Sequence, residues 1–235
     1  RHGAQHTIFL DLPAKHRHRP IQAACRATPH ASVNQLAPRC NVRHRANIRT
    51  LARMLSRLFG RKRQVSEVIL IRTYEAIVAA ARQPLFFSDW QVPDTPLGRF
   101  ESLSLHMILF LHRTKAADAG LKALGQEVVE EFFKDVDHSL RELGIGDTSV
   151  PKRMKKLARM FYGRAAAYDA GLESGDGAAL AVALQRNIFP DRPEWAEAPK
   201  MAAHVMTVAK SLAAQDAADI LAGNVNFPKP SDEQP

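Results

Sequence analysis

The chain has 235 residues and a formal net charge of +9, with 33 Lys and Arg against 24 Asp and Glu. The excess lies in residues 1–53, which hold ten of the basic residues and one acid, so residues 54–235 balance 23 cations against 23 anions. Because the basic pI belongs to one segment, it is not the nucleic-acid footprint of a folded domain, and we expect no DNA partner. Both cysteines, Cys25 and Cys40, also lie in this segment, which excludes disulfides, thiolate zinc sites and cysteine nucleophiles from the rest.

Residues 1–53 are rich in histidine, contain no methionine and show almost no hydrophobic periodicity. Met54 then opens the run MLSRLFGRKR, which is typical of a natural protein start. We therefore expect a disordered basic leader over 1–53 that does not belong to the native folded product, for example an over-extended gene start. The alternative is an Arg-rich organelle transit peptide, whose composition the leader shares in part. Zinc binding is disfavoured because no His or Cys pair has a finger-like spacing.

Residues 54–65 form a basic amphipathic start, in which three apolar side chains can share one helical side beside four cations (Leu55, Leu58 and Phe59; Arg57, Arg61, Lys62 and Arg63). This pattern favours a weak anchor for an anionic membrane surface, and a solvated terminus is the alternative. No stretch approaches the roughly 20 apolar residues that span a bilayer. We expect a cytoplasmic protein, peripheral to the inner membrane if the anchor acts, or a mitochondrial one if the leader is a transit peptide.

Residues 66–223 are predicted to be a single all-α domain of about six helices. Helical spacing of apolar residues and the positions of Gly and Pro predict helices from Ser66 to about Arg82, from Asp94 or Thr95 to about Ala117, from about Leu121 to the stop at Gly144, from Pro151 to about Leu172, over 179–189 and from Met201 to Gly223. The first is apolar nearly all round, which is typical of a central helix. An aromatic connector, 85–90, follows it, and the Pro-rich tail 224–235 is expected to be disordered.

The turn before the fourth predicted helix has the features of a helix stop and a helix start. Gly144 and Gly146 tolerate the left-handed backbone that ends helices. Asp147, Thr148 and Ser149 offer capping oxygens, and Pro151 suits the first turn of the next helix. Its buried stripe is predicted to contain Met154, Leu157, Ala158, Phe161, Ala165, Tyr168 and Leu172.

Five cations follow this helix start at once: Lys152, Arg153, Lys155, Lys156 and Arg159. Cations at a helix N-terminus oppose the helix dipole, at a cost of roughly a few tenths of a kcal/mol each when exposed. The cluster therefore indicates an anionic partner outside the protein, or internal neutralisation by Glu127, Glu130 and Glu131 of the preceding helix. A solvated charged face is the alternative that needs no partner.

No catalytic, metal or cofactor motif stands out in residues 54–235. His106 and His112 are six residues apart on one helix, so they face different sides, cannot share a metal and are expected at core or boundary positions. Gly144, Gly146 and Asp147 do not form a phosphate loop, because no strand precedes them. We expect neither a cofactor nor a bound metal.

Three runs resemble the ubiquinol–cytochrome c chaperone family: DTPLGRFESLSLHMILFLHRTK (94–115), LRELGIGDTSVPKRMKKLARMFYGRAAAY (140–168) and LAVALQRNIF (180–189). The resemblance covers roughly 66–222 and is closest to the bacterial members. Its most specific parts are GDTSVPKRMKKLARMFYGR and the helix that contains Leu105 and His106. Members are assembly factors for ubiquinol–cytochrome c reductase, the quinol-oxidising complex of respiratory chains.

The resemblance implies a non-enzymatic, all-α chaperone without a cofactor, whose client is the membrane protein cytochrome b or its nascent chain. Mitochondrial relatives work at the ribosome exit with a small partner protein, so the ribosome surface and a small partner subunit are further expected partners. The family pattern and the helix analysis single out the same candidates for partner binding: His106, Arg113, Lys152, Arg153, Lys155, Lys156, Arg159, Tyr162, Arg164 and Arg186. Structural roles are the alternative for Asp147 as a cap, Gly163 as a close helix contact and Arg164 as a buried ion pair.

Two other functions compete with the chaperone. One is an enzyme acting on a lipid or quinone-like substrate, built from acids that meet across the helical bundle. The other is a nucleic-acid binder, disfavoured because the domain is neutral and has no row of aromatic residues beyond Tyr162. An open apolar groove favours the chaperone, whereas an enclosed polar pocket with convergent acids favours the enzyme.

Overall fold

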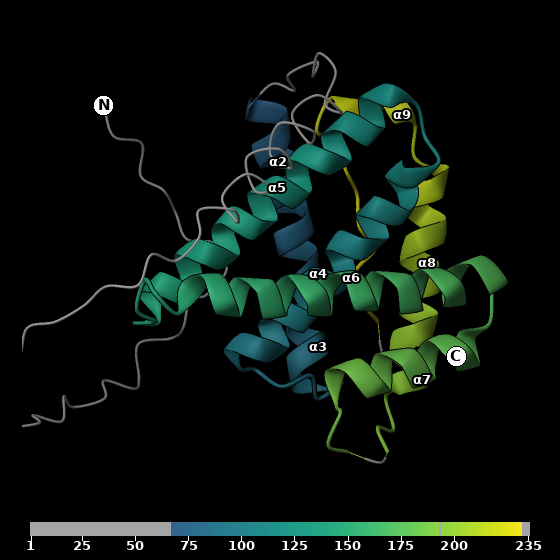
Figure 1. Cartoon of the computed structure of the whole chain (residues 1–235). Helices are drawn as coiled ribbons and strands as arrows, with labels where there is room; N and C mark the ends of the chain where they lie inside the picture. The colour runs from purple at the N-terminus through teal and green to yellow at the C-terminus, as the bar shows by residue number, and fades with distance from the viewer. Residues whose placement is uncertain (1–66, 193, 232–235) are drawn as a thin grey trace, which may run out of the picture. The chain divides into compact units, whose positions relative to one another are not determined.

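The computed structural model describes residues 67–192 and 194–231, and these residues form helices and no strand (Figure 1). The helices are α2 (Glu67–Ala81), α3 (Pro84–Ser88), α4 (Pro96–Lys115), α5 (Ala119–Glu142), α6 (Val150–Ser174), α7 (Gly177–Ile188), α8 (Ala198–Ala214) and α9 (Ala217–Leu221). The all-α prediction is therefore confirmed. The expectations for residues 1–53 and 54–65 lie outside the described residues. Two helices of five residues each, α3 and α9, are additional to the six that the sequence predicts.

Helix α4 is the centre of the described part of the chain. It contacts α2, α5, α6, α7 and α8, and every residue from 100 to 110 is buried. In Figure 1, α4 runs behind α6 and between α2 and α8. The prediction that the first helix is central is wrong, because Val68 and Ile71 of α2 are exposed. A helix is central when other helices pack closely against all of its sides. The small side chains of Ser102 and Ser104 allow such packing on α4, although their polarity lowers the hydropathy of this helix.

Caps and close contacts fix where α4 begins. The hydroxyl of Thr95 accepts a hydrogen bond from the amide of Gly98 at 3.1 Å, which confirms the predicted start at Thr95 and Pro96. A Cβ on Gly98 would lie 1.8 Å from the carbonyl oxygen of Pro93, so only glycine fits between the two segments.

The predicted helix stop at Gly144, after α5, is also confirmed, since its φ of 76° lies in the left-handed region.

The last predicted helix is interrupted, so that it becomes α8 and α9. The Asp216 side chain caps α9 by accepting from the amide of Ala218 at 2.8 Å. Gln215 stands at the break, and its side chain makes two hydrogen bonds with the backbone of Asn226, at 2.7 and 2.9 Å. The predicted disordered tail starts too early, because Val225 is buried and Phe227 packs against His106 with ring centroids 6.1 Å apart.

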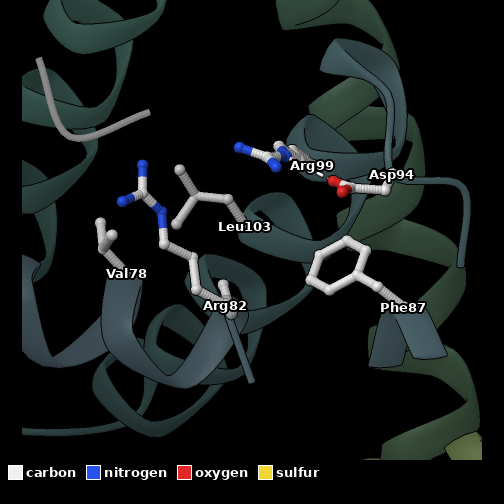
Figure 2. Close-up of a pocket in the computed structure, with 7 residues that line it drawn as sticks. Val78, Arg82, Phe87, Asp94, Arg99 and Leu103 are labelled. Atoms are coloured by element: carbon white, nitrogen blue, oxygen red, sulfur yellow. Dashed lines mark hydrogen bonds and ion pairs between the residues drawn. The ribbon is translucent and has the colours of Figure 1, made fainter. Parts of the chain in front are cut away.

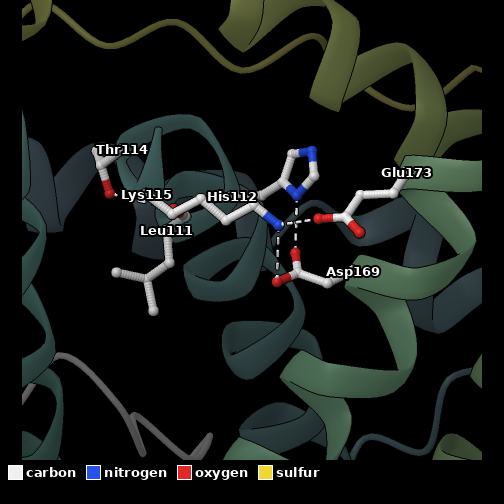
Figure 3. A network of polar contacts seen from close by, with 6 residues as sticks. All are labelled: Leu111, His112, Thr114, Lys115, Asp169 and Glu173. Atoms are coloured by element: carbon white, nitrogen blue, oxygen red, sulfur yellow. Dashed lines mark hydrogen bonds and ion pairs between the residues drawn. The ribbon is translucent and has the colours of Figure 1, made fainter. Parts of the chain in front are cut away.

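A polar cluster joins the C-terminal end of α4 to the C-terminal part of α6 (Figure 3). His112 donates from Nδ1 to Asp169 at 2.7 Å, and Lys115 contacts both Asp169 at 3.2 Å and Glu173 at 2.5 Å. His112 is partly exposed, as expected of a boundary histidine. The contacts hold one end of α6 on α4, while the basic end of α6 lies far along the same helix.

Helix lengths and composition bear on membrane contact. Among the helices of residues 67–192 and 194–231, none combines the length with the hydropathy that a bilayer-spanning segment requires.

Candidate partner-binding site

An open apolar groove of about 360 Å³ lies where the start of α4, the end of α5 and the first half of α6 meet. Buried and half-buried apolar side chains from these three helices line it: Phe100, Val136, Leu140, Leu157 and Met160. Two further lining residues, Leu97 and Leu143, are 52% and 43% exposed. Large apolar side chains that stay exposed beside an apolar depression are typical of an interaction site.

Stacked aromatic rings under the groove hold its three helices together. Phe132 of α5 stacks on Phe100 of α4, with ring centroids 5.9 Å apart, and also contacts Phe161 of α6 at 5.3 Å. All three rings are buried. The predicted buried stripe of α6 is thus confirmed at Phe161, and the groove rests on a rigid part of the core.

The five cations of α6 face away from this core. Lys152, Arg153, Lys155, Lys156 and Arg159 are all exposed, as predicted. Within the described part of the chain, none of the five forms an ion pair or a hydrogen bond through its side chain. Internal neutralisation by the acids of α5 therefore does not occur there, and Glu131 pairs instead with Lys134 at 2.9 Å.

Two of these cations also line the apolar groove. Arg153 and Lys156 form part of its wall, together with Met160. The same three residues line a second, more open depression of about 830 Å³, to which Lys152 and Arg159 also contribute. The groove and the cationic face therefore form one continuous surface, which we call the basic-rimmed groove.

The start of α6 differs in one detail from the prediction. The structural role of Asp147 is not that of a cap, because its carboxylate accepts a hydrogen bond from Arg141. Ser149 occupies the N-cap position, but its side chain makes no capping hydrogen bond. Among the described residues the amides of the first turn thus have no side-chain cap, and the carboxylate of Asp147 is bound by Arg141 of α5.

Two predicted partner-binding residues, Arg164 and His106, are buried, and a third, Arg113, is partly buried. Arg164 is buried and forms a two-point ion pair with Glu101 of α4, of which the bond from Nη2 to Oε1 is 2.5 Å long. Burial raises the pKa of Glu101 to about 7, against the opposing effect of Arg164. Arg164 also donates to the carbonyl of Asn187 at 3.4 Å. The structural interpretation of Arg164 as a buried ion pair is confirmed.

His106 and Arg113 likewise serve the fold. The Nδ1–H of His106 donates to the carbonyl of Ser102 at 2.8 Å, and burial lowers the pKa of His106 to about 4. Arg113 donates to the carbonyls of Leu212 at 2.9 Å and Gln215 at 3.1 Å, where α8 ends. A cation at the C-terminus of a helix satisfies free carbonyls and complements the dipole.

Tyr162 and Arg186 are exposed, and Tyr162 remains 59% accessible although its ring contacts Phe161. Neither lines the basic-rimmed groove, and Arg186 belongs to α7. The prediction that Gly163 makes a close helix contact is wrong, because a Cβ built there meets no atom of another described helix within 4 Å. Gly163 is exposed on the outer side of α6.

Sequence reasoning missed three features of the groove. Leu97 and Leu143 fit an apolar helix pattern, so nothing in the sequence distinguishes them from core residues. Ser139 lines the groove and is 1% exposed, and its Oγ has no hydrogen-bond partner in the described part of the chain. Ser139 follows Val136 by three residues, so the helix pattern places it on the inner face, but the pattern gives no signal of an unpaired hydroxyl.

A smaller cavity of about 220 Å³ lies between α2, α3 and α4 (Figure 2). Its polar lining residues are Arg82, Arg99 and Asp94, and Arg99 contacts Asp94 at 2.6 Å. The hydrogen bond from Arg99 lowers the pKa of Asp94. The cavity holds one carboxylate, which is kept ionised by its arginine, and thus lacks the convergent acids that the enzyme alternative needs.

Comparisons with known proteins agree with this architecture. The model of the family described as ubiquinol-cytochrome C chaperone matches residues 88–227. This range contains the whole basic-rimmed groove and covers more than half of the chain. The chain belongs to the ubiquinol–cytochrome c chaperone family.

Two relatives show how far the likeness extends. The crystal structure of the Cbp3 homologue from Brucella abortus is 52% identical with a TM-score of 0.66, and the match covers 77% of this chain and 97% of that one. Ubiquinol-cytochrome c reductase complex assembly factor 1 from Drosophila melanogaster is 30% identical over 121 residues, which are 49% of this chain. The match spans 46% of the fly protein, so about half of that protein has no counterpart in the alignment.

Proposed function

We propose that this protein is a non-enzymatic assembly chaperone for ubiquinol–cytochrome c reductase, and that its client is cytochrome b or its nascent chain. The observation that carries the proposal is the basic-rimmed groove, an open apolar surface beside five exposed cations. The family match over residues 88–227 and the name of the fly relative support the role in assembly. They do not concern the client, which the resemblance of the sequence to the family suggests and with which the apolar groove is compatible.

An unassembled membrane protein exposes apolar segments to water. Its apolar segments gain roughly 25 cal/mol for each Å² that a chaperone removes from water. Leu97 and Leu143 offer such contact without unfolding the chaperone, because both are already exposed. The cations beside the groove attract anionic groups, so the ribosome surface, a small acidic partner subunit and an anionic membrane are further candidates for contact. A place in the cytoplasm or at the inner membrane is part of this proposal.

The enzyme alternative gains no support from the sites described above. Its requirement was a set of acids that converge on a pocket, whereas Glu101 is bound by Arg164 and Asp94 by Arg99. The groove itself is lined by apolar and cationic residues with one serine.

Co-purification from membranes tests the proposal. The tagged full-length chain is purified from mildly solubilised membranes of cells that make the reductase, and bound cytochrome b is scored by immunoblot. We expect Leu97→Asp with Leu143→Asp to lose cytochrome b while the melting temperature holds, since both side chains are exposed. Ile71→Asp is the matched control, because Ile71 is 44% exposed on α2 and lies outside the groove. Equal recovery of cytochrome b by the groove variant and the control would contradict the proposal.

A further inference from the structure

We propose that the basic-rimmed groove recognises an amphipathic helix with acidic residues on another protein. One face of this helix inserts apolar side chains between α4, α5 and α6, and its carboxylates bind Arg153 and Lys156. The inference rests on the proposed function, in which the groove holds the client, and adds the chemistry of the segment that is recognised.

The shape of the groove favours protein side chains over a flat surface. Phe100 and Val136 at its base are 2% and 1% exposed, whereas Leu97 and Leu143 at its edge are about half exposed. A side chain projecting from a helix can reach such a recessed base. A membrane surface would meet the exposed leucines and the cations but would leave the base uncovered, so lipid headgroups are disfavoured as the occupant.

The charges at the rim specify the polar side of the occupant. Arg153 and Lys156 are three residues apart on α6, so they lie on neighbouring turns of one face. Lys152 and Arg159 extend this row, and none of these cations has a partner among the described residues. Acids at helical spacing on the occupant match such a row, and they would relieve the conflict of the cations with the α6 dipole.

A buried hydroxyl gives a second, independent indication that the groove is incomplete. Oγ of Ser139 has no hydrogen-bond partner among the described residues, although Ser139 is only 1% exposed and lines the groove. Buried polar groups in native proteins are nearly always hydrogen-bonded. Because this oxygen is covered, a polar group on the occupant can supply the missing partner only after the Ser139 side chain turns toward the groove.

Gly163 supports an approach along the outer side of α6. It follows Lys156 by seven residues, or two turns, and therefore continues the cationic row. No neighbouring atom requires a glycine at this position, and glycine disfavours the helix that contains it. A bare backbone on an exposed helix permits close approach by a second helix.

Site-specific photo-crosslinking of the full-length chain in cells that make the reductase tests the inference. p-Benzoylphenylalanine replaces Leu97 or Leu143, with Ile71 as the matched control position, and mass spectrometry maps the crosslinked peptide. The expected product contains apolar residues with two or more acids within one or two helical turns. Arg153→Glu with Lys156→Glu is expected to lower the crosslink yield about tenfold, from the reversal of two charge contacts. Changing the mapped acids to Lys should restore the yield of the reversed variant.

Each other outcome overturns the inference. These outcomes are a crosslink to lipid, to RNA, to a second copy of this chain or to a peptide without acids, and a yield that is insensitive to charge reversal. The identity of the crosslinked protein separately tests the proposed function. A crosslink to an acidic helix of a protein other than cytochrome b would contradict the proposed client but agree with the proposed chemistry of the groove. A crosslink to a non-acidic segment of cytochrome b would agree with the proposed client but contradict the proposed chemistry of the groove.

Discussion

Arg164 and Glu101 form a buried, two-point ion pair that joins the middle of α6 to the first half of α4. The pair lies behind the basic-rimmed groove, one turn along α6 from Phe161. Its side chains are 10% and 3% exposed, so neither charge is available to a partner. The two residues hold α4 and α6, two walls of the groove, in position. They do not contact the partner that binds in the groove.

Removal of Arg164 is expected to destabilise the fold strongly. Arg164→Met leaves Glu101 buried without its cation, and breaking a buried pair typically costs about 3–5 kcal/mol. Since the pKa of Glu101 is already raised to about 7, the carboxyl can be neutralised by a proton. The cost should therefore be smaller at pH 5 than at pH 8. Urea unfolding at both pH values measures it, and equal destabilisation at pH 5 and pH 8 would contradict the prediction.

Acid should destabilise the protein through His106 and His204. Burial lowers the pKa of both rings to about 4, below their ordinary value near 6.5. Because the unfolded state binds protons first, the stability they contribute is fully present above pH 6.5 and is lost as the pH falls toward 4. Burial also raises the pKa values of Glu101 and Asp135, which act in the opposite direction, but only Glu101 has a shift as large as those of the two histidines. We expect a net loss of a few kcal/mol.

His204 provides the sharper test of this pH dependence. Neither ring nitrogen of His204 has a hydrogen-bond partner among the described residues, and its ring packs against Phe86 and Trp90 at 5.5 and 5.6 Å. His204→Leu should keep or raise stability at pH 7, by about 1 kcal/mol, because no hydrogen bond is lost. Its melting temperature should also fall less than that of the wild type between pH 6.5 and 4.5. An unchanged pH slope would show that His204 is not a titrating group of the transition.

Reversal of the α6 charges should affect function and not stability. Lys155→Glu, Lys156→Glu and Arg159→Glu remove no buried area, and they relax the dipole conflict by roughly a few tenths of a kcal/mol. We expect reductase assembly to fail while the melting temperature is kept. Phe161→Ala is the contrasting control, since the loss of this buried ring should cost about 3–5 kcal/mol. Normal reductase levels with the triple variant would mean that the cations are a solvated face.

Two glycines should respond to the same substitution with opposite sign. Gly163→Ala should raise stability by about 0.5–1 kcal/mol, because the added methyl group meets open space and favours the helix. Gly98→Ala should destabilise the protein, because its Cβ would clash with the backbone of Pro93. Chemical denaturation of both variants measures the difference. Reductase levels then show whether Gly163→Ala, although more stable, binds its client less well.

Periodicity along a single helix was enough to predict which of its residues are buried and which are exposed. The α6 stripe through Phe161 and Tyr168 is buried and the cations are exposed, because the two sets differ strongly in hydropathy. The sequence did not predict the burial of two polar residues of α4, Glu101 and Ser102, whose partners lie on other segments. Such partners are far away in the sequence, and a single helix pattern does not contain them.

The groove could not be predicted for a related reason. Its cations were visible in the sequence, but its apolar base comes from three helices whose relative placement decides which leucines remain exposed. Leu97 and Leu103 are both leucines of α4, yet they are 52% and 3% exposed. The structural role expected for Arg164 did not identify its partner, because Glu101 lies on another helix, 63 residues away in the sequence.

The contacts between α4 and α8 have a consequence for the order of synthesis. Arg113 binds the carbonyl of Leu212 across 99 residues of chain, and α8 covers one side of α4. Until α8 has left the ribosome, α4 has an uncovered apolar flank, so we infer that the domain completes its folding only after nearly all of it has been translated. The chaperone thus passes through a stage in which it exposes apolar surface and itself depends on protection from aggregation.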